Sequence, residues 1–191
     1  AHFSCPLILN AQAAAKKIRV LKYRYMLDDS LFPEEVDQYD AYTVREALNN
    51  CVAHQDYTMG GKITLTESED GFLVFSNLGQ FIPKSVEEVI TADAPESLYR
   101  NRFLADAMVN LDMIDTIGSG IKKLFSIQKA KFFPMPDYNL SEQKVTVRIT
   151  GKVLDLNYAR KLATVPDLSL VEIMALDKVS KRKALTESEI K

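Results

Sequence analysis

The most informative stretch of the chain is residues 43–57, where apolar residues recur at the spacing of an α-helix. One face of that helix collects residues that would turn toward a core: Val44, Ala47, Leu48, Cys51 and Val52. The neighbouring face mixes a carboxylate, an amide, an imidazole and a phenol around one small residue: Glu46, Asn50, Ala53, His54 and Tyr57. A solvated helix face more often carries pairs of Lys and Glu. We therefore interpret this second face as the floor of a site.

Both ends of the predicted helix carry signals of their own. Thr43 and Glu46 have the spacing of a capping box, in which two side chains satisfy the free N–H groups of a helix start. For Glu46 this role and a role in a site remain open as alternatives. Gly60 and Gly61 follow the helix, and a glycine in the left-handed conformation commonly ends one.

Alternation of apolar and polar residues predicts a sheet beside this helix. The clearest strand is residues 143–150, where Val145, Val147 and Ile149 share one face. Glu69-Asp70-Gly71 is typical of a hairpin turn between two further strands. The predicted strands are residues 19–27, 62–67, 72–76 and 143–150, and the other predicted helices are residues 10–18, 85–90, 155–163, 169–178 and two that begin near 101 and 121.

Residues 28–42 are acidic and contain Pro33, so we predict a loop there. Asn101 is placed to cap the helix that follows it. The buried side of that helix is predicted to consist of Phe103, Leu104, Ala107, Met108 and Leu111.

Composition narrows the class of protein. The chain has 191 residues, 47% of them hydrophobic, which is enough for one sizeable core. Its formal net charge of −2 excludes a global basic field that would attract nucleic acid or an anionic membrane. The sequence has no apolar run long enough to span a membrane and no signal-peptide pattern. Cys5 and Cys51 are far apart and show no zinc-ligand spacing with the two histidines, so we expect a reducing, cytoplasmic location.

The character of the sequence changes after Gly151. Two predicted helices separated by Pro166 lead into residues 178–183, which hold four cations in six positions. We divide the chain into a domain at residues 1–152 and, at residues 153–191, a linker with the start of a further domain. Because the chain does not begin with Met and ends within a helix-start pattern, we expect it to be part of a larger protein.

Two glycine-containing turns are candidate ligand sites. Asn77 and Gly79 follow a strand and tolerate unusual backbone angles, so the main chain there can approach a ligand closely, although an ordinary turn is the commoner explanation. Gly118-Ser119-Gly120 enters a helix, where free N–H groups and the positive end of the helix dipole favour an anion. A close packing turn is the usual alternative for such a sequence.

Four short sequences occur in the order found in one protein family. They are Arg45-Glu46-Ala47-Leu48-Asn49-Asn50-Cys51-Val52-Ala53-His54-Gln55-Asp56-Tyr57, Ser76-Asn77-Leu78-Gly79, Arg100-Asn101-Arg102-Phe103-Leu104-Ala105 and Gly118-Ser119-Gly120-Ile121. With them, residues 20–149 resemble the GHKL-type ATPases (gyrase B, histidine kinases, MutL), and more closely the divergent ATPase-like domain of bacterial RecG-related helicases and transcriptional regulators. The resemblance implies an α/β (α+β) two-layer sandwich, with helices on a mostly antiparallel GHKL/Bergerat-like sheet and a helical C-terminal extension.

The resemblance also implies ATP and Mg²⁺ as cofactors. Asn50 matches the asparagine that holds Mg²⁺ bridging the phosphates, a task suited to an amide oxygen. Glu46 matches the catalytic glutamate that polarises the attacking water. Asn77 and Gly79 match the residues that receive adenine.

The remaining implied site residues are at the phosphate end and along the helix. Gly118, Ser119 and Gly120 match the turn that binds phosphates through its N–H groups. His54 is expected to shape the pocket, with a buried, hydrogen-bonded role as the alternative.

Several positions depart from the family pattern. Asn77 replaces the usual aspartate, and its amide can accept a hydrogen bond but lacks the charge. Leu78 replaces a proline, Gln55 replaces an arginine, and Phe81 stands where classical members have a second glycine, so that its ring is expected to fill part of the base pocket. These changes weaken the expectation of hydrolysis more than that of the fold.

Three functions compete. The first is a regulatory, nucleotide-binding module of a DNA-binding transcriptional regulator, between an AlbA- or Schlafen-like N-terminal domain and a C-terminal winged helix that would begin near Leu168; DNA would be bound by those flanking domains. The second is a Mg²⁺-dependent ATPase coupled to DNA processing, although the chain lacks the P-loop pattern. The third is a degenerate dimerisation domain that pairs through residues 3–9 or 18–26, and we expect a homo-oligomer with no membrane partner.

Overall fold

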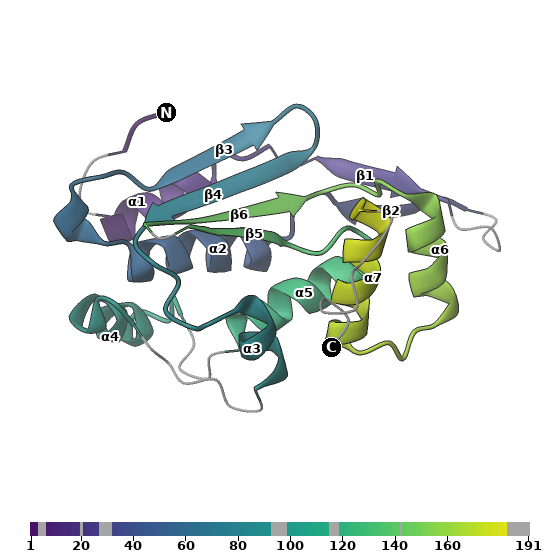
Figure 1. Ribbon diagram of the computed structural model, residues 1–191. Coiled ribbons are helices and arrows are strands. Elements are labelled where there is room, and N and C mark those ends of the chain that lie inside the picture. The colour runs from purple at the N-terminus through teal and green to yellow at the C-terminus, as the bar shows by residue number, and fades with distance from the viewer. Residues whose placement is uncertain are drawn as a thin grey trace.

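The fold is built on a four-stranded antiparallel sheet, as the computed structural model shows for residues 1–3, 7–19, 21–26, 32–92, 99–114, 119–141 and 143–182. In spatial order the strands are β3 (Thr64–Ser68), β4 (Phe72–Leu78), β6 (Lys144–Thr150) and β5 (Asp137–Ser141). The predicted hairpin between β3 and β4 is confirmed, with Gly71 at φ +83°. Figure 1 shows this sheet forming one layer and the helices forming the other, which confirms the predicted sandwich.

The helices lie mainly on one side of the sheet. They are α1 (Leu7–Ala15), α2 (Ala41–His54), α3 (Val86–Thr91), α4 (Arg102–Asn110), α5 (Gly120–Ala130), α6 (Leu156–Thr164) and α7 (Leu170–Arg182), with a short 3₁₀ helix, η1 (Tyr57–Met59). The central helix α2 packs against β4 on one side and against α1, α4 and α5 on others. None of the helices in the described part of the chain has the length and apolarity to cross a membrane.

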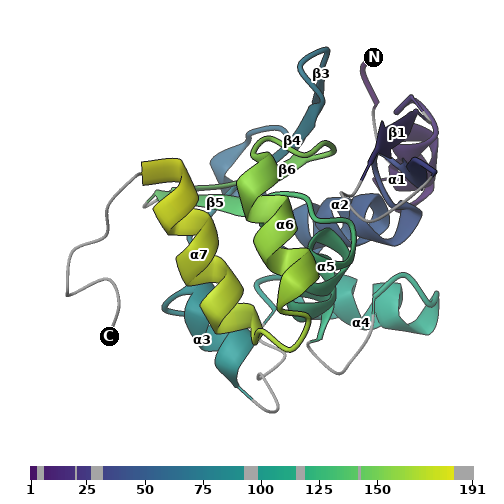
Figure 2. The same cartoon turned by 90° about the vertical axis from the view of Figure 1, so that its right-hand side faces the viewer.

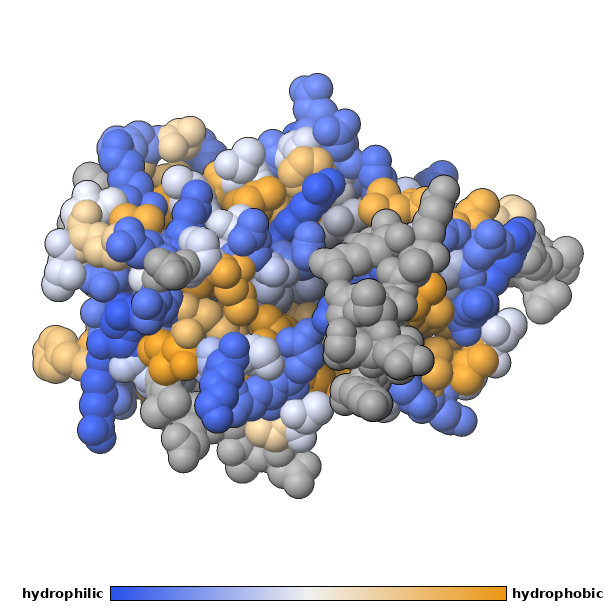
Figure 3. All heavy atoms as spheres, viewed as in Figure 1, coloured by the Kyte–Doolittle hydropathy of each residue, from blue (hydrophilic) through white to orange (hydrophobic). Residues whose placement is uncertain are grey.

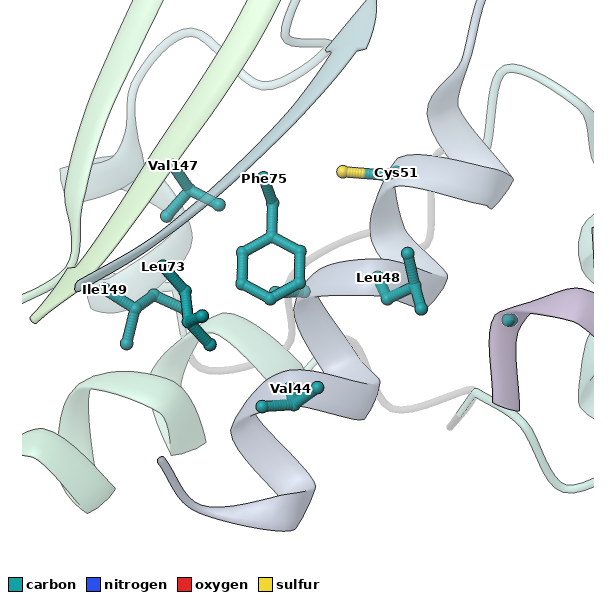
Figure 4. Packing of buried hydrophobic residues seen from close by; sticks show 9 residues of the cluster. Val44, Leu48, Cys51, Leu73, Phe75, Val147 and Ile149 are labelled. Atoms are coloured by element: carbon teal, nitrogen blue, oxygen red, sulfur yellow. The ribbon is translucent and has the colours of Figure 1, made fainter. Parts of the chain in front are cut away.

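The main core lies between α2 and the two central strands. The predicted apolar face of α2 supplies Val44, Leu48 and Cys51, while the sheet supplies Leu73, Phe75, Val147 and Ile149 (Figure 4). Phe75 and Val147 are paired across β4 and β6, so their side chains project from the same face of the sheet. Each fully buried side chain of this size contributes about 1.5–3 kcal/mol. This core fixes the orientation of α2 and therefore of its polar face.

Two further clusters attach the other helices. Val52 and Ala53 of α2 pack with Ala105 and Met108 of α4. A second cluster joins α3, α5, α6 and α7 through Ile90, Phe125, Tyr158, Leu162, Ile173 and neighbouring residues. Figure 2 shows α6 and α7 side by side against the body of the domain. The predicted helices after Gly151 are therefore present and packed, while the domain boundary at residue 152 and a winged helix beyond it remain predictions.

The start of α2 differs from the predicted capping box. The cap is Asp40, whose carboxylate accepts hydrogen bonds from the N–H groups of Tyr42 and Thr43. Thr43 lies in the first turn of the helix and is 1% exposed, and its hydroxyl is buried without a hydrogen-bond partner among the described residues. The capping interpretation of Glu46 is consequently wrong. At the other end α2 stops at His54, and left-handed Gly60 ends η1 instead.

Two other local predictions are also wrong. The predicted loop at residues 28–42 contains β2 (Glu34–Asp37), which pairs with β1 (Lys22–Tyr25) in a separate two-stranded sheet. In α4, Phe103 is 90% exposed and Leu111 58% exposed, whereas Ala105 and Met108 form the buried side.

Candidate functional site

The polar face of α2 passes the start of α5. Glu46 is 9% exposed and lies against Gly120, the first residue of α5, so closely that a Cβ atom there would overlap its carboxylate. A carboxylate beside the start of a helix is favoured by the helix dipole. The structure therefore brings together two predicted site residues from helices far apart in the sequence.

Asn50 lies one helical turn beyond Glu46. Its amide nitrogen donates a hydrogen bond of 3.1 Å to Glu46 Oε1. This bond engages one N–H of the amide and turns the NH₂ group toward Glu46, while the amide oxygen of Asn50 has no hydrogen-bond partner among the described residues. Amide oxygens are suitable ligands for a hard cation such as Mg²⁺. The orientation of Asn50 thus fits the role that the sequence assigned to it.

Asn49 is a positioning residue that the sequence analysis missed. It is 2% exposed, and its amide nitrogen donates to the carbonyl of Met113 at 2.6 Å. This bond ties α2 to the turn that follows α4, where Asp112 takes a positive φ of 54°. The sequence motif pointed to its neighbour Asn50. The contact of Asn49 joins residues far apart in the sequence, so it becomes visible only in the fold.

The glycine-rich turn is described in part. Ser119 precedes α5 and accepts a backbone hydrogen bond from Lys123, but its side chain does not cap the helix. Gly120 is buried beneath Glu46. Gly118 lies outside the described residues.

At the opposite end of α2, the end of β4 supplies Asn77 and Gly79. Asn77 belongs to β4 and, two residues beyond Phe75, shares the sheet face that packs on α2. It is 5% exposed, and its amide nitrogen donates to the carbonyl of Leu78 at 3.1 Å. In the described part of the chain its oxygen has no partner. Asn77 therefore presents an acceptor, as an adenine amino group requires.

Gly79 adopts a conformation that few other residues tolerate. Its φ is +111°, and its N–H donates to the carbonyl of Gln143 at 2.9 Å. An added Cβ would lie 2.9 Å from Arg100 Nε and 3.2 Å from Asp56 Cβ. The unusual backbone angle expected at this glycine is present, and the groups close to it are side chains of this chain. The close approach of a ligand there stays a prediction.

Gln55 joins the end of α2 to the end of β4. It is 1% exposed, and its carbonyl oxygen Oε1 accepts a hydrogen bond of 2.8 Å from Leu78 N–H. The backbone N–H of Asp56 donates in turn to the Leu78 carbonyl at 2.8 Å. A departure from the family pattern at Gln55 thus has a structural role here.

His54 ends α2 and stacks on Tyr99, with ring centroids 5.6 Å apart and an angle of 26° between the rings. Burial, with a smaller contribution from the Arg100 cation, lowers the pKa of His54 to about 4. The imidazole is therefore neutral at physiological pH. His54 is thus largely buried, as the alternative interpretation expected, and within the described residues its contact is aromatic stacking, with no side-chain hydrogen bond.

An aromatic group fills the space between the sheet and α5. Tyr138 of β5 stacks on Phe125 of α5 at 6.4 Å and also contacts Phe81 at 6.2 Å. Burial and the nearby Glu46 carboxylate raise the pKa of Tyr138 well above its ordinary value. Phe81 thus packs into the interior from the turn after β4. Figure 3 shows apolar side chains gathered on this face of the molecule between the sheet and helices α3 and α4.

The side chains that the structure describes do not by themselves form a metal centre. Within the described residues, no three or more His, Cys, Asp or Glu side chains gather where they could hold a metal ion. A magnesium ion near Asn50 would take its other oxygen ligands from phosphates and water, as Mg²⁺ commonly does in nucleotide sites.

Comparison with known proteins supports this interpretation of the fold. Residues 60–149 match the family described as "Putative ATP-dependent DNA helicase recG C-terminal". This match supports a RecG-related ATPase-like domain over residues 60–149. The matched range includes Asn77, Gly79 and Gly120, whereas Glu46, Asn50 and His54 precede it.

A solved structure of similar architecture is the DIP2311 protein from Corynebacterium diphtheriae. Its TM-score is 0.62 at 19% sequence identity, over 92% of this chain. This chain spans only 36% of that protein, and at this identity the likeness shows the fold alone. None of the curated proteins matches the chain significantly.

Proposed function

We propose that this RecG-related domain binds ATP with Mg²⁺ and serves as a regulatory module of a DNA-binding transcriptional regulator. The observation that carries the proposal is the orientation of two buried or half-buried amides. Asn50 and Asn77 both have their NH₂ groups held by the protein. Both therefore present oxygens, one suited to a cation and the other to the amino group of adenine.

The electrostatics of the phosphate end support a requirement for Mg²⁺. The carboxylate of Glu46 lies against the start of α5, and a bound triphosphate there would be repelled by it. A divalent cation offsets that repulsion when it is bound between the phosphates and Asn50. ATP without Mg²⁺ should accordingly bind much more weakly than its magnesium complex.

A second candidate is a Mg²⁺-dependent ATPase. It is favoured by the hydrogen bond between Glu46 and Asn50, which places a carboxylate one turn from the proposed cation ligand. In that function Glu46 would orient the attacking water as general base. The regulatory proposal requires only binding, with DNA bound by flanking domains and the chain in the cytoplasm as a homo-oligomer.

Titration calorimetry with ATP, in magnesium and in EDTA, tests the proposal. We expect micromolar affinity with Mg²⁺ and a loss of at least tenfold in Asn50→Ala, which removes the amide oxygen. Asn110→Ala is the matched control, because Asn110 is exposed at the end of α4. No binding by the unmodified chain up to millimolar ATP would contradict the proposal and favour a dimerisation domain. Phosphate release that stops in Glu46→Gln would instead favour the ATPase.

A further inference from the structure

Three segments that are distant in sequence meet beside Gly79. They are the end of α2, the turn that ends β4, and the pair Arg100-Asn101 that precedes α4. The contacts of this pair were not predicted from the sequence, where Asn101 was expected only to cap α4. Its side chain makes no capping bond to α4.

Arg100 joins the first two segments through separate nitrogen atoms. Nη2 donates to the carbonyl of Gln80 at 3.0 Å, and Nη1 lies 3.5 Å from Asp56 Oδ2. The third nitrogen, Nε, is buried without a hydrogen-bond partner among the described residues, next to the position that a side chain at Gly79 would occupy. An unpaired buried donor costs stability. The guanidinium therefore holds the turn at Gly79 in place. It also keeps one unpaired N–H donor at the base end of the site, which is the end where adenine is proposed to bind.

Asn101 attaches the same pair to α2. Its amide nitrogen donates to the carbonyls of Ala53 at 3.0 Å and Gln55 at 2.8 Å, which are among the last carbonyls of the helix region. Free carbonyls at a helix end need such partners. Asn101 thus fixes α4 to the end of α2 at the point where Arg100 fixes the turn after β4.

We propose that Arg100 and Asn101 act together as a latch that holds the end of α2, the turn at residues 78–80 and α4 as one unit, and thereby sets the geometry of the adenine end of the site. This rests on the proposed nucleotide function. Arg100 is a positioning residue in this account, because it acts on the ligand through Gly79 and Gln80. Through the latch, the position of α4 depends on whether the turn at residues 78–80 is ordered.

Hydrogen exchange of the nucleotide-free protein tests the latch without a ligand. In Arg100→Met, the amides of residues 78–80 and 55–56 should exchange about tenfold faster or more, as expected for loss of charge-assisted hydrogen bonds. Arg102→Met is the matched control, because Arg102 is exposed on α4. Arg100→Lys keeps the charge, but its single nitrogen atom cannot replace the two guanidinium nitrogens that contact Gln80 and Asp56. It should therefore exchange like Arg100→Met. Unchanged exchange in Arg100→Met, or full rescue by lysine, would overturn the latch.

Calorimetry then tests its connection to the site. Arg100→Met should weaken ATP and adenosine binding about tenfold and leave inorganic tripolyphosphate binding unchanged, because the latch borders only the base end. Equal affinity of variant and unmodified protein for ATP would overturn the connection. If the unmodified protein binds no ATP, the proposed function fails together with this connection, and the exchange data still decide whether the latch exists.

Discussion

Replacing Gly120 by alanine adds one methyl group in the first turn of α5, and we expect it to destabilise the protein. Alanine usually stabilises a helix relative to glycine, by about 0.5–1 kcal/mol. At this position the new Cβ would overlap the carboxylate of Glu46. Glu46 is 9% exposed and is hydrogen-bonded to Asn50, so it moves aside only by breaking that bond.

The structure sets the size of the effect. Overpacking of this kind costs about 1–3 kcal/mol. After subtraction of the helix gain, the net loss lies between about 0 and 2.5 kcal/mol in the free energy of unfolding. For a chain of this length each kcal/mol lowers the melting temperature by about 2–4 °C.

A double-mutant cycle in urea identifies the cause. In a Glu46→Ala background the clash is absent, so Gly120→Ala should become neutral or stabilising. The difference between the two backgrounds measures the contact itself. Two results would contradict this reasoning: a stabilising effect of Gly120→Ala in the unmodified protein, or the same effect in both backgrounds. Either would mean that Glu46 does not lie against the start of α5, and the proposed arrangement of the phosphate end of the site would be wrong.

Two further predictions concern α2. Asp40→Ala should lower the free energy of unfolding by about 0.5–2 kcal/mol because it removes the helix cap. Thr43→Val should be neutral or stabilising, because the Thr43 hydroxyl is buried without a hydrogen-bond partner among the described residues. A larger loss of stability in Thr43→Val than in Asp40→Ala would support Thr43 as the cap instead. Folding lowers the pKa of His54 from 6.5 to about 4, so between these pH values the unfolded chain binds a proton that the folded chain does not. The folded state therefore keeps its full stability above pH 6.5 and loses stability as the pH falls toward 4. Urea unfolding should show a loss of about 2 kcal/mol from this residue between pH 7.5 and pH 5, which is absent in His54→Gln; an equal loss in that variant would refute the assignment.

The sequence predicted well what depends on local periodicity. The apolar face of α2, the β3–β4 hairpin and the alternation of β6 follow from repeating patterns along short segments. β2 was missed because its acidic residues have low strand propensity. In the structure they are paired across the hairpin, with Lys22 and Arg24 each 2.6 Å from the carboxylates of Asp37 and Glu35.

Contacts between site residues were predictable only where the residues share one helix. Glu46 and Asn50 are four residues apart, so their contact follows from helix geometry. The contacts of Asn49, Arg100 and Asn101 join segments far apart in the chain, and no local pattern encodes them. The buried side of α4 was misplaced for the same reason, because Ala105 and Met108 pack on Val52 and Ala53 of α2, a contact between segments far apart in the chain.

The central claim is that α2 holds a nucleotide site between the end of β4 and the start of α5. Hydrogen exchange of the unmodified chain with and without magnesium ATP tests it most directly. We predict slower exchange at both ends, residues 77–80 and 119–123, with residues 156–182 of α6 and α7 unchanged. Protection confined to α6 and α7, or no protection at saturating ATP, would contradict the account.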